Sequence, residues 1–520
     1  MTLHSIDLTI FVIYVLGLIA VAYYVSREKA GHDKNTDDYF LAGQSLPWWA
    51  IGASLIAANI SAEQIIGMSG SGYAIGLAIA SYEWMAAITL IIVGKYFLPI
   101  FLKHKIYTMP QFLQERYDSR VKTTMAIFWL AVYVFVNLTA VLWLGALAIN
   151  AITGVDLTTS MIVLAALSLA YSLYGGLKAV AFTDIIQVVL LIIGGLFLSY
   201  MTLNMIGDGQ GMMAGFSTLS AELPEKFTMI LSEDSPHYAD LPGISVLVGG
   251  MWVVNMSYWG FNQYIIQRTL AAKDLAEAQK GIAFAAFLKL LMPVIVVLPG
   301  IAAVLILPDL AKADHAYPEL MNMMPVGLKG LVFAALVAAI LSSLASMTNS
   351  VATIFTMDLY KQAKSEQSQS HYVLVGRVVS VVALVIALFT AKPLLGDSEQ
   401  AFQYIQEFTG FFTPGIVVLF VLGMFWKKTT ANAALVAAIG SAVLSLVFKM
   451  LLPEVPFMDR IGLVFLSCLV LAVVVTLIQK PEAHPAAVKL EEVNFSTRTD
   501  FNISALLVTL ILIAFYTTWW

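Results

Sequence analysis

Three charged side chains stand inside long apolar runs, where an unpartnered charge is costly. Glu83 lies in SYEWM, Lys289 lies in AFLKLLMP, and Asp184 lies near one end of its run. On insertion scales each costs roughly 2.5–3.5 kcal/mol at a membrane-helix centre, so such residues usually face a cavity. Glu83 and Lys289 could form a structural ion pair, or could together bind a ligand with many hydroxyls, because each hydroxyl donates and accepts. Asp184 could instead reach water at the end of its helix.

Amide and aromatic side chains share one predicted helical face. Asn255, Tyr258, Trp259 and Asn262 follow the spacing i, i+3, i+4, i+7. This combination suits a sugar, whose ring stacks on an aromatic side chain while its hydroxyls bond the amides. The alternative is an aromatic packing stripe with buried amides. An amide and an apolar side chain are also one turn apart at two other places, Gln64 with Met68 and Phe402 with Gln406.

Hydroxyl side chains form a third pattern, with Ala339, Ser342, Ser343 and Ser346 at the same helical spacing. Serines in membrane helices often bond a carbonyl of their own helix, which is the simpler interpretation. The alternative is a sodium site, because Na⁺ prefers oxygen ligands. Backbone carbonyls freed at a helix break, such as 57–60, could complete the site without net protein charge.

The elements that must position these residues are two apolar segments interrupted by polar residues and glycine. The first is Leu55–Gly72, LIAANISAEQIIGMSGSG, and the second is Gly249–Gln263, GGMWVVNMSYWGFNQ. Irregular backbone at membrane depth must line a cavity, since lipid cannot satisfy its polar groups. Interrupted segments in both halves of a chain indicate a transporter's binding site. A structural helix kinked at glycine is the alternative for either segment alone.

Composition excludes several classes of protein. The chain has 520 residues, of which 60% are hydrophobic and 12% charged, with mean hydropathy +0.84. A soluble domain carries about 25% charged residues, so we expect a polytopic membrane protein in a lipid bilayer. The net charge of −5 and the lack of a basic region argue against nucleic acid. We see no catalytic constellation and no phosphate-binding loop, so we expect an ion-driven transporter without an organic cofactor, not an enzyme.

We predict fourteen apolar spans. They are 6–26, 48–70, 78–101, 123–151, 158–174, 180–203, 243–266, 281–307, 327–357, 372–392, 402–425, 430–450, 461–479 and 501–519. When the N-terminus is placed outside, 20 of the 28 Lys and Arg residues fall on the inner connections and their flanks. This asymmetry follows the positive-inside rule. Both termini should therefore lie outside the cytoplasm.

The spans divide into predicted structural units. They are a leading helix and cytoplasmic loop (1–47), spans two to six (48–203), an extracytoplasmic loop (204–242), spans seven to eleven (243–425) and peripheral spans (426–520). Five spans is an odd number, so the two five-helix units should have opposite topology. The inner segment 480–500 is polar, and we expect it to be flexible.

Five long motifs resemble the sodium/solute symporter family. They are ASLIAANISAEQ, GSGYAIGLAIASYEWM, YWGFNQYIIQRTLAAK, VFAALVAAILSSLASMTNS and AFQYIQEFTG. The resemblance runs almost from end to end. It implies an all-α membrane protein whose core has the leucine-transporter-type arrangement of two inverted five-helix repeats. It also implies alternating access, in which Na⁺ and solute bind outside and leave to the cytoplasm.

The resemblance also implies a site, residue by residue. The hydroxyl-bonding set would be Gln64, Glu83, Asn255, Lys289 and Gln406. The outer gate would be Met68, Tyr82 and Phe402, the inner gate Tyr258, and Trp259 would flank the site. Sodium would be held by the carbonyls of Ala57, Ile60 and Ala339 and the hydroxyls of Ser342 and Ser343. Asp184 would lie on the sodium exit path.

Two positions depart from the family pattern. Ala86 stands where a serine beside the sugar is expected, and Ser257 replaces an aromatic residue next to Tyr258. The first departure leaves the choice between galactose and glucose open. We expect Na⁺-driven uptake of a monosaccharide, galactose or glucose, through a bacterial inner membrane. The alternative is a Na⁺-coupled symporter of the same fold for another small solute, and the oligomeric state stays undetermined.

Overall fold

The apolar runs of this chain form helices, because a helix satisfies its own backbone hydrogen bonds in lipid. The structure is a computed structural model that describes residues 4–26, 45–106, 108–174, 177–398, 400–480 and 482–520. Within these ranges it contains helices, turns and one isolated β-bridge, between Leu46 and Ala272. Most of the loop expected within 1–47 falls on 27–44, outside the described residues.

Each of the fourteen predicted spans coincides with helical residues. The uninterrupted helices and helix runs are α1 (Ser5–Ser26), η3–α6 (Leu77–Lys103), α8–α9 (Ser119–Thr153), α10 (Leu157–Tyr174), α11 (Leu177–Ile206), α16–α17 (Leu275–Ile306), α19–α20 (Leu328–Ala363), α21 (Gln369–Leu395), α24 (Ala431–Leu451), α25 (Phe457–Gln479) and α26 (Thr499–Thr518). In the described part of the chain, nine helices are long and apolar enough to cross a membrane, or eleven with two bent pairs. The count of fourteen stays a prediction.

Three spans are broken. Helix α3 (Trp48–Asn59) and the run η2–α4 (Glu63–Ala74) meet at 62°, and α22 (Ala401–Thr409) and α23 (Thr413–Phe425) meet at 46°. The third break lies between α14 (Gly250–Phe261) and α15 (Gln263–Leu270). The first and third fall in the two segments that we expected to be irregular. The break at α22–α23 was not predicted.

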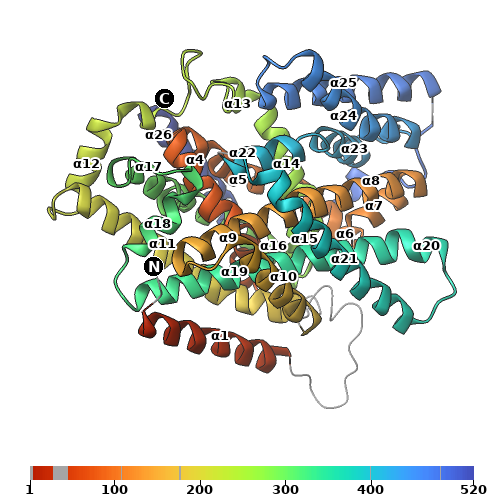
Figure 1. Ribbon diagram of the computed structural model, residues 1–520. Coiled ribbons are helices and arrows are strands. Elements are labelled where there is room, and N and C mark those ends of the chain that lie inside the picture. Colours follow the sequence, from red (N-terminus) through yellow and green to blue (C-terminus); the bar gives the residue numbers. More distant parts are fainter. Residues whose placement is uncertain (1–3, 27–44, 107, 175–176, 399, 481) are drawn as a thin grey trace.

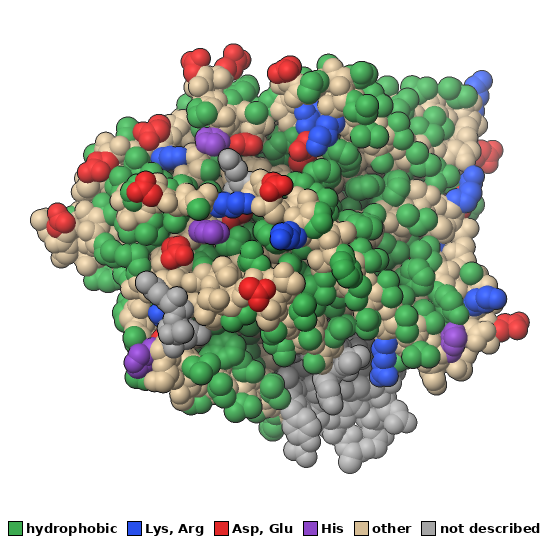
Figure 2. Space-filling view, in the orientation of Figure 1, with side chains coloured by type: hydrophobic (Ala, Val, Ile, Leu, Met, Phe, Trp, Pro, Cys, Tyr) green, Lys and Arg blue, Asp and Glu red, His purple; other side chains and the backbone are tan. Residues whose placement is uncertain are grey.

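Burial separates a core from a periphery. In α19 (Leu328–Thr353) 83% of the most apolar window is buried, against 17% in α26. Hydrophobic side chains cover most of the face seen in Figure 2, and charged side chains gather mainly toward its two opposite edges. Both chain termini lie at the same end of the bundle as α12 (Met212–Glu222) (Figure 1). The molecule is therefore a multi-pass membrane protein with an apolar girdle between two polar ends.

Two glycines let α3 and α16 (Leu275–Ile295) approach closely. A Cβ on Gly52 would lie 2.6 Å from the carbonyl oxygen of Gly281, and a Cβ on Gly281 would lie 2.8 Å from the Cβ of Ile51. Small residues allow such approach between membrane helices, where the hydrophobic effect supplies little attraction. This contact carries Lys289 of α16 to the broken end of α3.

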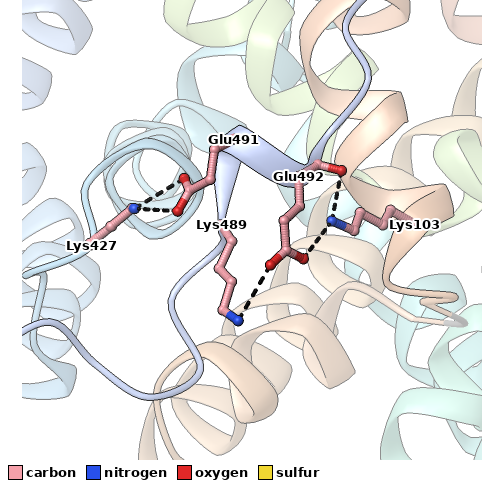
Figure 3. Close-up of polar contacts among 5 residues, drawn as sticks. All are labelled: Lys103, Lys427, Lys489, Glu491 and Glu492. Atoms are coloured by element: carbon pink, nitrogen blue, oxygen red, sulfur yellow. Dashed lines mark hydrogen bonds and ion pairs between the residues drawn. The ribbon is translucent and has the colours of Figure 1, made fainter.

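Residues 482–498, here called the strap, cross the polar end of the bundle opposite the termini. Lys103 donates to the Glu492 carbonyl (2.8 Å) and carboxylate (3.1 Å), and Lys427 pairs with Glu491 (3.0 Å), as Figure 3 shows. The side chain of Val488 is only 2% exposed. An apolar anchor and several exposed ion pairs therefore hold the strap against the bundle, while its expected flexibility stays a prediction.

We expect the apolar anchor to hold the strap more firmly than its ion pairs. Val488→Ser should lower stability by about 1–3 kcal/mol, since it buries an unpartnered hydroxyl and removes packing. Glu491→Gln should have little effect, because exposed ion pairs are screened by solvent. Thermal unfolding and trypsin cleavage after Lys489 would measure both. Equal sensitivity of the two variants would contradict this ranking.

Candidate substrate and sodium site

The first break places a group of polar side chains at the centre of the bundle. Helix α3 ends at Asn59, and Ile60 is extended (φ −72°, ψ 90°). The chain resumes as a π-helical turn, Glu63–Gly67, before α4 (Met68–Ala74). Such turns are rare and often mark functional sites. Asn59, Glu63 and Gln64 are all buried here, although each is polar.

The second break presents the aromatic face predicted from the sequence. Gly249 and Asn262 bound α14, and Asn262 is extended (φ −81°, ψ 124°). Along α14, Asn255 and Trp259 are buried and Tyr258 is half-buried. The Tyr258 hydroxyl accepts hydrogen bonds from Asn59 Nδ2 (3.1 Å) and from the Tyr264 hydroxyl (3.1 Å). The two breaks are thus joined by a hydrogen bond.

A pocket lies between the broken helices, and amides, carboxylates and aromatic rings line it. Among the expected substrate and gate residues, its lining includes Gln64, Tyr82, Glu83, Asn255, Tyr258, Trp259, Phe402 and Gln406. Sugars are bound by such surfaces, because rings stack on the apolar face of the sugar while polar groups bond its hydroxyls. Lys289 and Met68 are not part of the lining.

Lys289 lies behind the pocket and forms an ion pair with one of its walls. Its Nζ is 2.5 Å from Glu83 Oε2, it donates to Asn59 Oδ1, and it lies 4.8 Å from the Trp259 ring centroid. The Lys289 side chain is fully buried, and that of Glu83 is 4% exposed. Glu83 and Lys289 therefore form the structural ion pair that was one of the two interpretations of the sequence. Glu83 also lines the pocket.

Asp184 and Arg268 form a second buried ion pair. Asp184 Oδ1 accepts from Ser342 Oγ (2.7 Å), and its Oδ2 lies within 3.2 Å of Ser54 Oγ and 3.4 Å of Arg268. Asp184 is 1% exposed, so it does not reach water at its helix end. Arg268, which follows the predicted span 243–266, is 2% exposed and pairs with Asp184.

The residues expected to hold sodium lie where α3 and α19 pack together. The last turn of α3 leaves carbonyls without intrahelical partners, and Ala57 and Ile60 belong to this turn. Ser343 Oγ is buried and makes no hydrogen bond, while Ser342 Oγ, bonded to Asp184, keeps lone pairs free. Ala339 is buried one turn before them. Oxygens without partners are what a hard, univalent cation requires, so the donor set fits Na⁺.

Two residues of the expected outer gate are in contact through their rings. The Tyr82 and Phe402 rings meet edge to face at 5.0 Å, and the Tyr82 hydroxyl is 3.4 Å from Gln403 Oε1. Met68 is fully buried, and the preceding Gly67 packs against Phe402. Trp259 lies against Tyr258 with ring centroids 5.1 Å apart. The roles of these residues as gates stay predictions.

The pocket is also lined by Glu63, Tyr133 and Asn137, which the sequence did not predict as site residues. Gln406 donates to Glu63 (3.3 Å), and Tyr133 donates to Asn262 (2.8 Å). Tyr133 and Asn137 come from a π-helical turn, Tyr133–Leu138, inside the run α8–α9. The polar residues of the first break, including Glu63, were visible as interruptions of an apolar run. The π-helical turn had no comparable signal, since its residues are mostly apolar.

Comparisons with known proteins identify the family to which the chain is similar. A model of the sodium:solute symporter family matches residues 39–440. The chain is 53% identical to the sodium/glucose cotransporter of Vibrio parahaemolyticus, covering 100% of this chain and 99% of that one. It is 34% identical to the human sodium/myo-inositol cotransporter 2, covering 85% and 69% of the two chains.

Two solved structures share the fold. A Na⁺-coupled sialic acid symporter in a substrate-bound outward-open state matches with TM-score 0.77 and 23% identity, over 91% of this chain and 98% of that one. A nucleobase-cation-symport-1 family transporter matches with TM-score 0.56 and 13% identity, over 88% and 98%. Both likenesses concern the fold alone.

The ion pair of Glu83 and Lys289 should behave as a coupled unit. Glu83→Gln or Lys289→Met alone should destabilise the protein by about 3–5 kcal/mol, because each leaves a buried charge without its partner. The double variant should recover much of this loss. Thermal unfolding of the four proteins would provide the coupling energy, and additive effects of the single changes would disprove the coupling.

Proposed function

Because the chain belongs to the sodium:solute symporter family, we propose that it takes up a monosaccharide, galactose or glucose, together with Na⁺ by alternating access. The chain is a transporter and not an enzyme, and Na⁺ is its coupling ion. The observation that carries the choice of a sugar is the pocket between the broken helices, where amides, carboxylates and aromatic rings converge. Two relatives, named for glucose and myo-inositol, point to the same chemistry of neutral polyhydroxy solutes.

In this proposal the pocket distinguishes hydroxyls by number and position. Gln64, Glu83, Asn255 and Gln406 bond the sugar, and Lys289 acts through Glu83 by fixing the orientation of its carboxylate. Tyr258 stacks on the ring from the inner side, with Trp259 beside it. Met68, Tyr82 and Phe402 separate the sugar from the outside. The ring contact of Tyr82 and Phe402 supports this assignment, because both rings line the pocket and touch each other.

Sodium would be held by Ala57, Ile60, Ala339, Ser342 and Ser343. When bound, Na⁺ supplies a positive charge that draws the broken end of α3 toward α19. Asp184 is positioned to receive the ion on its way to the cytoplasm, since it already accepts a hydrogen bond from Ser342. Inward movement of one Na⁺ contributes about 2.3 kcal/mol per 100 mV of membrane potential.

The proposal includes fourteen crossings of a bacterial inner membrane, with both termini on the outer side. The common location of the termini at one end of the bundle supports an even number of crossings (Figure 1). It also includes two inverted five-helix repeats, 48–203 and 243–425, each beginning at a broken helix. The peripheral units, 1–47 and 426–520, and the loop 204–242 complete this arrangement.

Labelled galactose uptake into proteoliposomes tests the function. We expect accumulation with an inward Na⁺ gradient and none with K⁺ on both sides. Unlabelled glucose and myo-inositol serve as competitors, and they report whether Ala86, buried three residues after Glu83 in the same helix, relaxes the choice of hydroxyls. Absence of Na⁺-dependent uptake of any of these solutes would reject the proposal in favour of another small solute.

A single hydroxyl tests the sodium site. Ser343→Ala should raise the Na⁺ concentration for half-maximal uptake by roughly tenfold or more, since a hydrogen-bonding group on a charge contributes about 1.5–3 kcal/mol. The matched control is Thr348→Val in the same helix, where the lost hydroxyl bonds only the Leu344 carbonyl. Unchanged Na⁺ activation in Ser343→Ala would remove this serine from the site.

A further inference from the structure

The loop between α17 (Val297–Ile306) and α18 (Ala316–Asn322) holds both ends of the connection from α21 to α22. Lys312 Nζ donates to the carbonyls of Gly396 (2.5 Å) and Ser398 (3.3 Å), just beyond the C-terminal end of α21. Asp314 Oδ2 accepts from the backbone N–H of Ala401 (3.1 Å), the first residue of α22. A cation at a helix C-terminus and a carboxylate at an N-terminus both complement the helix dipoles.

Helix α22 carries Phe402, one residue of the proposed outer gate. Phe402, in contact with Tyr82, follows Ala401 directly, Gln403 lies in the same turn and Gln406 in the next. The bond from Ala401 to Asp314 therefore fixes the end of α22 nearest the gate. A displacement of α22 large enough to part the two rings must strain or break this bond.

Asp314 also packs against α4, the second half of the broken span that begins with α3. A Cβ on Gly70 of α4 would lie 2.8 Å from Asp314 Cα and 2.9 Å from its nitrogen, so only glycine permits this packing. Asp314 is 2% exposed, and its Oδ1 has no hydrogen-bond partner. Asp314 thus lies between α4, which begins with Met68, and α22, which contains Phe402. Both Met68 and Phe402 belong to the proposed outer gate.

We propose that Asp314 is a positioning residue of the outer gate, a latch that holds α22 against α4 while the gate is shut and is stronger when its carboxyl is protonated. The role as a gate latch rests on the proposed transport function. The neutral carboxyl still accepts the Ala401 hydrogen bond through its carbonyl oxygen, and it no longer carries an unpaired charge into an apolar wedge.

The direction of the pH effect follows from linkage. Burial raises the pKa of Asp314 to about 7, against smaller lowering effects of the Ala401 N–H and Lys312. Opening would expose the carboxyl to water and return its pKa toward about 3.9. The shut gate then binds the proton more tightly, so it gains stability as the pH falls through 7 and loses stability as the pH rises.

Other titratable groups belong to the segments around Asp314. They are Asp309, Lys312 and His315 on its own loop, Tyr73 in α4, Tyr317 and Glu319 in α18, Glu63 in η2, and Tyr404 and Glu407 in α22. Lys312 is the one whose charge acts on the Asp314 pKa. Its removal should therefore move the midpoint of the pH response upward.

Hydrogen exchange of the segment 400–409 tests the latch without depending on transport. In the full-length protein in nanodiscs, protection corrected for intrinsic exchange should fall about tenfold from pH 6 to pH 8. Asp314→Asn should remove this pH dependence, and Lys312→Met should shift its midpoint upward. The matched control is Asp309→Asn, an exposed carboxylate of the same loop. An unchanged pH profile in Asp314→Asn would overturn the latch.

Na⁺-driven galactose uptake at equal pH on both sides then tests the gating role. The apparent KM for galactose should be higher at pH 6 than at pH 8 in the wild type and nearly constant in Asp314→Asn. A pH-dependent latch without this change in KM would overturn the link to the gate. Absence of uptake at every pH would reject the proposed function and with it the gating role, while the exchange result would still decide the latch.

Discussion

Buried charge in an apolar bundle is the constraint on which this structure depends. Two ion pairs satisfy it, Glu83 with Lys289 and Asp184 with Arg268, and all four side chains are at most 4% exposed. Each pair joins a residue from 48–203 to a residue from 243–425. The two halves of the chain are therefore held together by charges that neither half could bury alone.

These ion pairs also determine where the polar surface of the pocket lies. Lys289 bonds both Glu83 and Asn59, and Asn59 in turn bonds Tyr258, so one ammonium group organises the wall and the inner aromatic side of the site. Asp184 similarly accepts a hydrogen bond from Ser342, one of the proposed sodium ligands. Solute and ion would thus bind to neighbouring oxygens whose positions are set by two networks spanning the same two halves. This arrangement suits coupling, because movement of one half relative to the other disturbs both networks.

Much of the fold could be predicted from local sequence, but the break between α22 and α23 and the pairing of Asp184 with Arg268 could not. Apolar runs and polar interruptions are local signals, and they identified the helices and the breaks at Asn59 and Asn262. The burial of Arg268 depends on Asp184, which lies 84 residues away in the chain, so local sequence carries no signal of it. The pocket lining of Tyr133 and Asn137 depends on a π-helical turn without a sequence signature. Lys289 pairs with Glu83 and is not part of the pocket lining. Its position depends on the close contact of Gly52 in α3 with Gly281 in α16, and these residues are far apart in the sequence.

The distance along the chain between paired charges has a consequence for synthesis. Glu83 and Lys289 are 206 residues apart, and ribosomes add about 5–20 residues per second. Glu83 therefore emerges about 10–40 s before its partner exists, while the helix that carries it is already leaving the ribosome. During that interval the carboxyl must remain near water or be shielded by the insertion machinery. The first half of the molecule therefore enters the membrane before the lysine that pairs with its buried carboxylate has been made.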